Sequence, residues 1–280
     1  MKPNPARNLW TALEPLHAVV YFAPEPAAAA KDVGLRGWWM GYFAGRAAPL
    51  GPIGPEPVTS MFFGFAPRMV ARALPDAWTF ASPDDVLRTR IEAVEAALTR
   101  LLGPAAVDEL ATLLEQAVAG CQFDARPLAA AWSAVPSPDR PLARLWLATA
   151  VLREHRGDGH VLAAVTSGLT GLETTLTHIA TGATVREQVQ RARGWTDEEW
   201  SEATANLVER GLIDAEGLTP AGAEIRRTIE ETTDRLAAAP LEALGPAGVD
   251  RVLELATPLS RRIIDSGGVP VPNPMGLPRP

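Results

Sequence analysis

The chain has 280 residues, enough for one large domain or two smaller ones that each bury a hydrophobic core. Its formal charge of −7 argues against a general attraction to nucleic acid or to anionic membranes. Cys121 is the single cysteine, which excludes an intrachain disulfide and a thiolate metal cage. Ala and Leu are abundant whereas Val, Ile and Tyr are sparse, so we predict a mainly α-helical fold.

Helical periodicity predicts a series of helices along most of the chain. In chain order they are expected at residues 5–23, 33–48, 58–74, 82–103, 105–120, 141–156 and 159–181, with a shorter element within 124–138. Pro15 interrupts the first helix and favours a kink or a split there. In the second, Gly37, Gly41 and Gly45 share one face, where another backbone can approach closely.

Nothing in the sequence suggests a targeting or membrane-spanning segment. Residues 1–10 lack the apolar core of a signal peptide, and no apolar run approaches the roughly 20 residues that span a bilayer. We therefore expect a cytoplasmic protein with no membrane partner.

Between Thr184 and Leu244 the local signals agree on a winged-helix order of helix, helix, hairpin and long helix. Patterns typical of capping boxes begin at Thr184 and Thr196. A minimal β-hairpin is expected over 212–219, and Pro220 favours the start of the long helix.

These signals divide the chain into three parts. We expect a helical ligand-binding or catalytic domain over 1–181 and a winged-helix domain over 182–265. The Gly/Pro-rich tail over 266–280 has too few apolar residues to form a core, so it is either loose or draped over a neighbour, where it folds over a pocket.

Two family resemblances rest on quoted segments. WTDEEWSEATANLVERGLIDAEGLTPAGAEIRRTIEETTDRL resembles the second half of a MarR-type regulator, in which RGLI ends the recognition helix and LTPAG opens the dimer helix. Nearly the whole chain resembles an actinobacterial helix-turn-helix family of poorly defined function, through LEPLHAVVYFAPE, GLRGWWMGYFAGRAAPLGP, VLREHRGDGHV, RGWTDEEW and NPMGL. The first resemblance implies a homodimer through residues 220–236, and neither fixes the chemistry.

The charge of the expected recognition helix disfavours DNA as a partner. Most protein–DNA affinity comes from Lys and Arg beside phosphates. Residues 196–210 carry a single Arg, Arg210, against five acidic residues, namely Asp197, Glu198, Glu199, Glu202 and Glu209. Those in the first turn also favour the positive end of the helix dipole, which is an alternative reason for their presence.

Ionisable residues crowd a predicted helix junction at 152–160. There Gly157 is expected to end one helix, and Asp158 is expected to cap the next. The two helix dipoles then favour charged His155 and neutral His160, as an acid–base pair requires. We therefore predict His155, His160 and Asp158 as catalytic residues. Alternatively, Asp158 is only a cap and its charged neighbours are solvated.

Arginines near this junction suit an anionic ligand, and we predict Arg153 and Arg156 as ligand-binding residues. His17, Tyr42 and Arg46 are expected to line the opposite wall of the same pocket. The alternative is an aromatic core in which Arg46 caps a helix end.

No metal or haem site has a diagnostic spacing, and the cofactor stays open. A set of His17, His155 and His160 is suited to zinc or iron, and a single histidine to haem. On one continuous helix His160 and His178 would lie about 27 Å apart, too far to share an ion.

Two functions remain as hypotheses. The first is a diverged winged-helix protein that binds or transforms a small polar or anionic molecule, as an enzyme of specialised metabolism would. The alternative is a MarR-like, ligand-responsive DNA-binding regulator.

Overall fold

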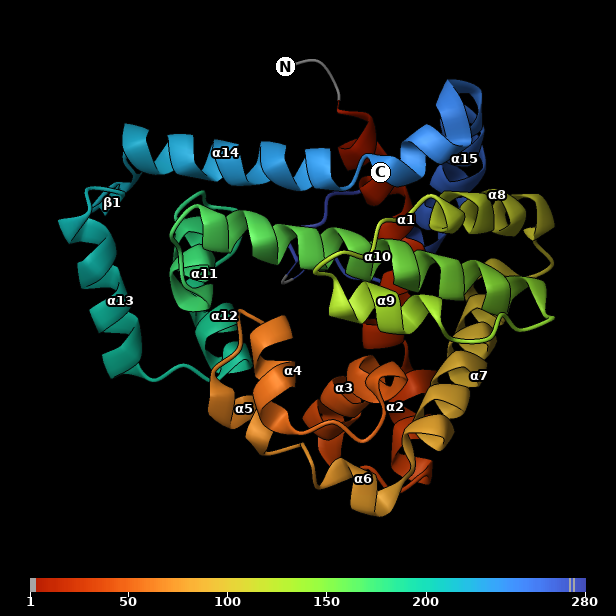
Figure 1. Ribbon diagram of the computed structural model, residues 1–280. Helices are drawn as coiled ribbons and strands as arrows, with labels where there is room; N and C mark the ends of the chain where they lie inside the picture. Colours follow the sequence, from red (N-terminus) through yellow and green to blue (C-terminus); the bar gives the residue numbers. More distant parts are fainter. Residues whose placement is uncertain (1–3, 272, 274) are drawn as a thin grey trace.

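A computed structural model describes residues 4–271, 273 and 275–280 of the chain. This part of the chain is mainly α-helical, as predicted, with 15 α-helices and a single two-stranded hairpin (Figure 1). The helices before the hairpin are α1 (Pro5–Phe22), α2 (Pro24–Asp32), α3 (Gly37–Ala47), α4 (Pro55–Met61), α5 (Pro67–Ala71), α6 (Ala77–Phe80), α7 (Pro83–Leu102), α8 (Asp108–Ala119), α9 (Pro127–Ser133), α10 (Pro141–Thr166), α11 (Gly171–Ile179), α12 (Arg186–Arg193) and α13 (Asp197–Glu209). The hairpin strands are β1 (Ile213–Asp214) and β2 (Gly217–Leu218), and α14 (Pro220–Leu236) and α15 (Ala239–Asp265) follow. Among the helices described, none is both long and apolar enough to cross a membrane.

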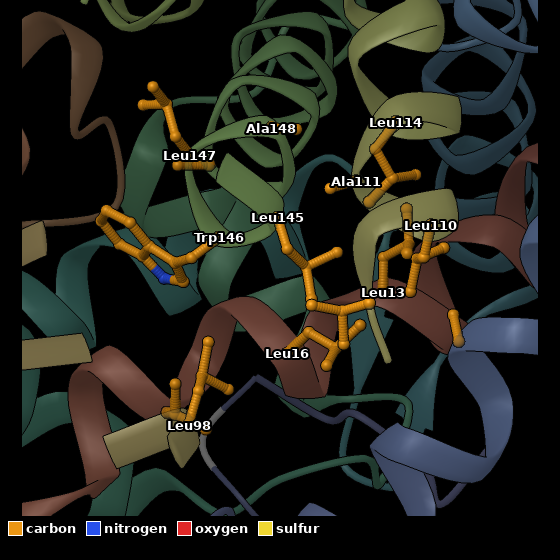
Figure 2. Packing of buried hydrophobic residues seen from close by; sticks show 14 of the residues in the cluster. Leu13, Leu16, Leu98, Leu110, Ala111, Leu114, Leu145, Trp146, Leu147 and Ala148 are labelled. Atoms are coloured by element: carbon orange, nitrogen blue, oxygen red, sulfur yellow. The ribbon is translucent and has the colours of Figure 1, made fainter. Parts of the chain in front are cut away.

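The largest core forms where α1 packs against α15, α10 and α7. Leu16 of α1, Leu98 of α7, Leu110 of α8 and Leu145 of α10 meet in it and are almost completely buried (Figure 2). Helix α1 continues through Pro15, so this proline does not split it. The last long helix of the chain thus packs against the first.

A second core surrounds α3 and the short helices that follow it. Side chains, and not the predicted backbone, approach the glycine face at two positions: a Cβ on Gly41 would lie 3.1 Å from Ala30 Cβ, and one on Gly45 would lie 2.5 Å from Arg90 Nη1. The helix predicted at 58–74 is wrong, because the chain there forms α4, a turn and α5. Pro67 begins α5, and the residue before a proline favours the extended backbone that Ala66 adopts.

The segment from α12 to α14 has the element order predicted for residues 184–244. Thr196 and Glu199 form the expected capping box of α13, and β1 pairs with β2 in antiparallel register. The capping box predicted at Thr184 is wrong, because α12 begins after Val185 without a side-chain cap. A third core, including Trp200 and Ile229, holds these elements together.

The predicted break at Gly157 is also wrong, because α10 runs unbroken over 26 residues. Asp158 does not cap this helix; its carboxylate accepts a hydrogen bond of 3.0 Å from the backbone N–H of Ala129, near the start of α9. Gly159 leaves room for a neighbour, since a Cβ there would lie 3.3 Å from Leu236 of α14. Packing against α9 and α14 therefore maintains a helix that the local sequence disfavours.

The tail after α15 lies against the rest of the protein. Val269, Asn273 and Leu277 are buried, and the Asn273 side-chain amide donates to the carbonyl oxygen of Leu277 at 3.1 Å. The sequence predicts a tail that is either loose or packed over a neighbouring part of the protein, and the structure shows the second alternative.

Candidate functional site

A cavity of about 750 Å³ lies where the N-terminal helices meet the segment from α11 to α14. Helix α10 contributes residues from Arg153 to Val161, and α14, which lies along α10 in Figure 1, contributes residues from Ala223 to Thr233. The start of α1, the turn between α4 and α5, the stretch from α11 to α12, and Met275 and Gly276 of the tail also contribute to the lining. We call it the junction cavity.

Positive charge exceeds negative charge around the junction cavity. Seven arginines line it: Arg7, Arg46, Arg153, Arg156, Arg193, Arg226 and Arg227. Only four carboxylates do so: Glu14, Glu154, Asp158 and Glu230. The cavity therefore differs in sign from the whole chain, whose formal charge is −7.

Glu154 is the centre of a buried set of ion pairs on one wall. Arg46 donates to both of its carboxylate oxygens, at 3.0 and 2.7 Å, and Arg153 donates to it at 3.0 Å. Burial alone would raise the pKa of Glu154, but the charges of Arg46 and Arg153 lower it to about 2. Arg153 also lies 3.6 Å from Glu14, whose pKa is raised by burial. The two arginines therefore hold Glu154 in its ionised form.

Other parts of the lining have buried polar atoms that lack partners among the described residues. Residues lining the junction cavity contribute five buried nitrogen or oxygen atoms that make no hydrogen bond in the described part of the chain: Arg156 Nη1, Thr174 Oγ1, Thr184 Oγ1, Arg226 Nε and Arg226 Nη1. Arg226 is 8 % exposed, and it keeps one ion pair, at 2.7 Å with Glu230. Buried polar groups are nearly always satisfied in folded proteins by protein, water or ligand, so a group of such atoms around one cavity is available to bind a ligand.

Two imidazoles face the junction cavity. Nδ1 of His160 lies 3.0 Å from the Thr233 hydroxyl. Burial is the main cause that lowers the pKa of His160 to about 4, and the charge of Arg226 acts in the same direction. Burial also lowers the pKa of His178. The helix predicted at 159–181 ends at Thr166, and α11 begins at Gly171. The expected separation of His160 and His178 along one helix is therefore wrong, since both line this cavity.

The structure brings together five of the eight predicted site residues: Arg46, Arg153, Arg156, Asp158 and His160 all line the junction cavity. Tyr42 does not line the junction cavity, but its hydroxyl accepts a hydrogen bond of 3.0 Å from Arg46, which does.

The two remaining histidines lie elsewhere. His17 is 2 % exposed and stacks on Trp146 at a ring distance of 5.6 Å. His155 lies beside Phe123, and burial lowers its pKa to about 4. On a continuous helix, residues five apart diverge by about 140°, so His155 faces away from His160. The predicted catalytic pair is not assembled.

Sequence reasoning missed Arg193, Arg226 and His178. A signal for the break before His178 was present, because Thr170 and Glu173 have capping-box spacing and form that motif. The arginines had no such signal, since they come from helices that meet only in the folded chain.

No group of three or more His, Cys, Asp or Glu side chains is placed to hold a metal ion among residues 4–271, 273 and 275–280. Haem or metal ligation by the histidines stays a hypothesis without a site.

The outward face of α13 is acidic, as the sequence indicated. Asp197, Glu198, Glu202 and Glu209 are exposed on it. Arg186 of α12 pairs with Asp197 at 3.0 Å instead of projecting beyond it. Helix α13 therefore presents negative charge to solvent.

No curated protein and no solved structure matches the chain. The model of the helix-turn-helix family matches residues 6–270, almost the entire length, and spans both the N-terminal helices and the segment from α11 to α14. The protein belongs to this helix-turn-helix family.

Proposed function

We propose that the protein binds a small anionic molecule in the junction cavity. The observation that carries the proposal is the group of buried, unpartnered polar atoms on Arg156, Thr174, Thr184 and Arg226. Three of these five atoms are guanidinium N–H donors and two are hydroxyls, and an anion supplies the acceptors that they lack.

The size and composition of the cavity fit this ligand class. About 750 Å³ is within the range of small-molecule sites. Phe62, Phe63 and Phe65 line one side, so the ligand has an apolar part as well as its anionic group. Arg193, which lies 4.2 Å from the centre of the Phe65 ring, is positioned between these two parts.

A chemical transformation of the ligand is a further part of the hypothesis. With a pKa of about 4, His160 is neutral at pH 7 and can accept a proton from a bound molecule. Asp158 is less suited to this role, because its carboxylate accepts the Ala129 N–H. His155 does not line the cavity, so a role for it in the same reaction requires a rearrangement of α10.

Arg226→Met and Arg235→Met test the binding site as a matched pair on α14. Arg226 lines the cavity, whereas Arg235 is exposed and outside it. Loss of Arg226 leaves Glu230 its ion pair of 2.7 Å with Arg7, so we expect R226M to fold.

Thermal-shift screening of the wild-type protein against phosphate esters and mono-, di- and tricarboxylates identifies the ligand, and calorimetry measures its affinity. We expect R226M to weaken binding at least tenfold, equivalent to about 1.4 kcal/mol, and R235M to leave it unchanged. Equal affinity of both variants, or no stabilisation by any anion, would overturn the proposal.

The second candidate is a ligand-responsive, MarR-like DNA-binding regulator. Membership in the helix-turn-helix family favours it, and the acidic face of α13 opposes it. A gel-shift assay at low salt against promoter fragments separates the two. Salt-sensitive, sequence-selective binding supports the regulator, and its absence supports a protein that only binds or transforms a small molecule.

A homodimer through α14 belongs to the same proposal. The exposed residues Glu224 and Glu231 of this helix both pair with Arg227, at the edge of the junction cavity. Such a dimer would be polar and salt-sensitive, and sedimentation at low and high salt measures it.

A further inference from the structure

A second cavity, of about 260 Å³, lies between α2, α3 and α7 and shares no lining residue with the junction cavity. Its walls are mostly apolar side chains, among them Val20, Ala30, Leu35 and Val86. Arg90 of α7 is the charged residue in its interior. We call it the Arg90 cavity.

Arg90 is buried without a counter-charge. It is only 9 % exposed, and its Nε has no hydrogen-bond partner in the described part of the chain. Its guanidinium lies near two aromatic rings, 5.7 Å from the centre of Tyr21 and 5.8 Å from that of Trp146. Burial lowers the pKa of Arg90. A guanidinium stays charged in proteins, so this arrangement keeps a desolvated positive charge beside a cavity.

The neighbouring carboxylates do not balance this charge. Glu154 is already shared by Arg46 and Arg153, and Glu14 lies beside Arg153 with a pKa raised by burial. The buried cluster therefore has three arginines for two carboxylates. An uncompensated buried charge is costly, so an anion beside Arg90 would stabilise the protein.

The backbone of α3 leaves room for this guanidinium. A Cβ on Gly45 would lie 2.5 Å from Arg90 Nη1, and one on Gly41 would lie 3.1 Å from the Cβ of Ala30. The two glycines allow α3 to lie close to α2 and to Arg90, which gives a structural reason for their spacing.

The rim of the Arg90 cavity is exposed to solvent. Trp38 lines the cavity, is 46 % exposed, and stacks on Tyr42 at a ring distance of 5.3 Å. Lys31, also exposed, lines the same cavity. A ligand can therefore enter beside Trp38 and reach Arg90.

We propose that the Arg90 cavity binds an amphipathic monocarboxylate, with its carboxylate on Arg90 and its apolar body among the side chains of α2, α3 and α7. The single arginine in the interior favours a ligand with one carboxylate, because a bidentate guanidinium–carboxylate pair provides hydrogen-bond partners for both Arg90 and the ligand. The apolar walls select a short alkyl chain or one ring, and each buried methylene adds about 0.8 kcal/mol. This site does not depend on the proposed function of the junction cavity.

Octanoate is the test ligand, and 1-octanol is its uncharged match. Calorimetric titration of the full-length protein should give one octanoate bound per chain, with octanol at least tenfold weaker. Arg90→Met should weaken octanoate at least tenfold and leave octanol unchanged. Because the substitution removes an uncompensated buried charge, the ligand-free variant should melt no lower than the wild-type protein.

A second pair of variants keeps Arg90 in place. Ala27 lines the cavity, whereas its neighbour Ala28 is exposed and does not. We expect Ala27→Phe to weaken octanoate at least tenfold by filling the entrance, and Ala28→Phe to leave it within twofold. The proposal is overturned if the wild-type protein does not bind octanoate or binds octanol equally well. It is also overturned if R90M binds octanoate within twofold of the wild-type protein, or if A28F blocks binding as strongly as A27F.

Discussion

Glu154→Gln tests the buried ion pairs of the junction cavity. The substitution removes the negative charge that Arg46 and Arg153 share, while the amide keeps the shape of the side chain. Both arginines then remain buried without their main counter-charge. Breaking a buried pair in this way costs about 3–5 kcal/mol of stability.

The pKa of Glu154 gives a second value for the stability that the charge of this side chain contributes. A carboxyl whose pKa falls from 4.5 to about 2 on folding stabilises the folded state by about 3 kcal/mol at neutral pH. Because the folded-state pKa is the lower one, this stabilisation is present above pH 4.5 and is lost as the pH falls toward 2. We expect E154Q to lower the free energy of unfolding by about 3 kcal/mol at pH 7 and by less than half of that at pH 3.

Urea unfolding followed by circular dichroism at both pH values measures this difference. Glu109→Gln is the control, because Arg251 donates to both oxygens of Glu109 at 2.7 and 2.8 Å, but on the surface. Solvent screens that pair, so we expect little change in E109Q. A loss in E154Q that is no larger than in E109Q, or that is the same at pH 3 and pH 7, would refute the reasoning.

Three further changes have measurable outcomes. Gly171→Ala should lower the melting temperature by several degrees, because the added methyl overlaps the carbonyl oxygen of Phe63; an unchanged value would contradict this contact. Burial raises the pKa of Asp158 to about 6, so its ionised form destabilises the folded protein at higher pH. Asp158→Asn should therefore stabilise the protein by about 3 kcal/mol above pH 6 and not below pH 4. Urea unfolding measures the difference, and the opposite pH trend would contradict this prediction. Burial raises the pKa of Cys121 to about 12, so a thiol reagent at pH 8 should label the folded protein about a thousandfold more slowly than the urea-unfolded one, and equal rates would show an accessible thiolate.

Elements with complete local signals were predictable from sequence. Ser82 caps α7, Thr196 and Glu199 form the capping box of α13, and Thr219 caps α14, which begins at Pro220. Each motif satisfies the backbone N–H groups at the start of its own helix, so it needs no distant partner. The break predicted at Gly157 is wrong because contacts with distant residues, and not the local sequence, determine the structure there. Glycines weaken a helix locally, but contacts with α9 and α14 decided the outcome at this position.

The candidate site was predictable only in part. Arg153, Arg156 and His160 were identified because they crowd one stretch of sequence, and they do line one cavity. Their partners, Arg193 and Arg226, come from α12 and α14, and only tertiary packing brings them close. The predicted pairing of His155 with His160 depended on a helix end that does not exist, so it was lost when α10 proved continuous.

The continuity of α10 also determines how the two halves of the chain respond to one another. Its first turns hold Leu145 and Trp146 in the large core, and its last turns hold Ala163 in the core beneath α13. At 1.5 Å per residue it is a rod of about 39 Å. A molecule that tilts this rod at Arg153 and Arg156 displaces both ends together, because there is no flexible joint between them. We therefore expect a ligand bound near the middle of α10 to displace the elements packed on both of its ends, the core beneath α13 included.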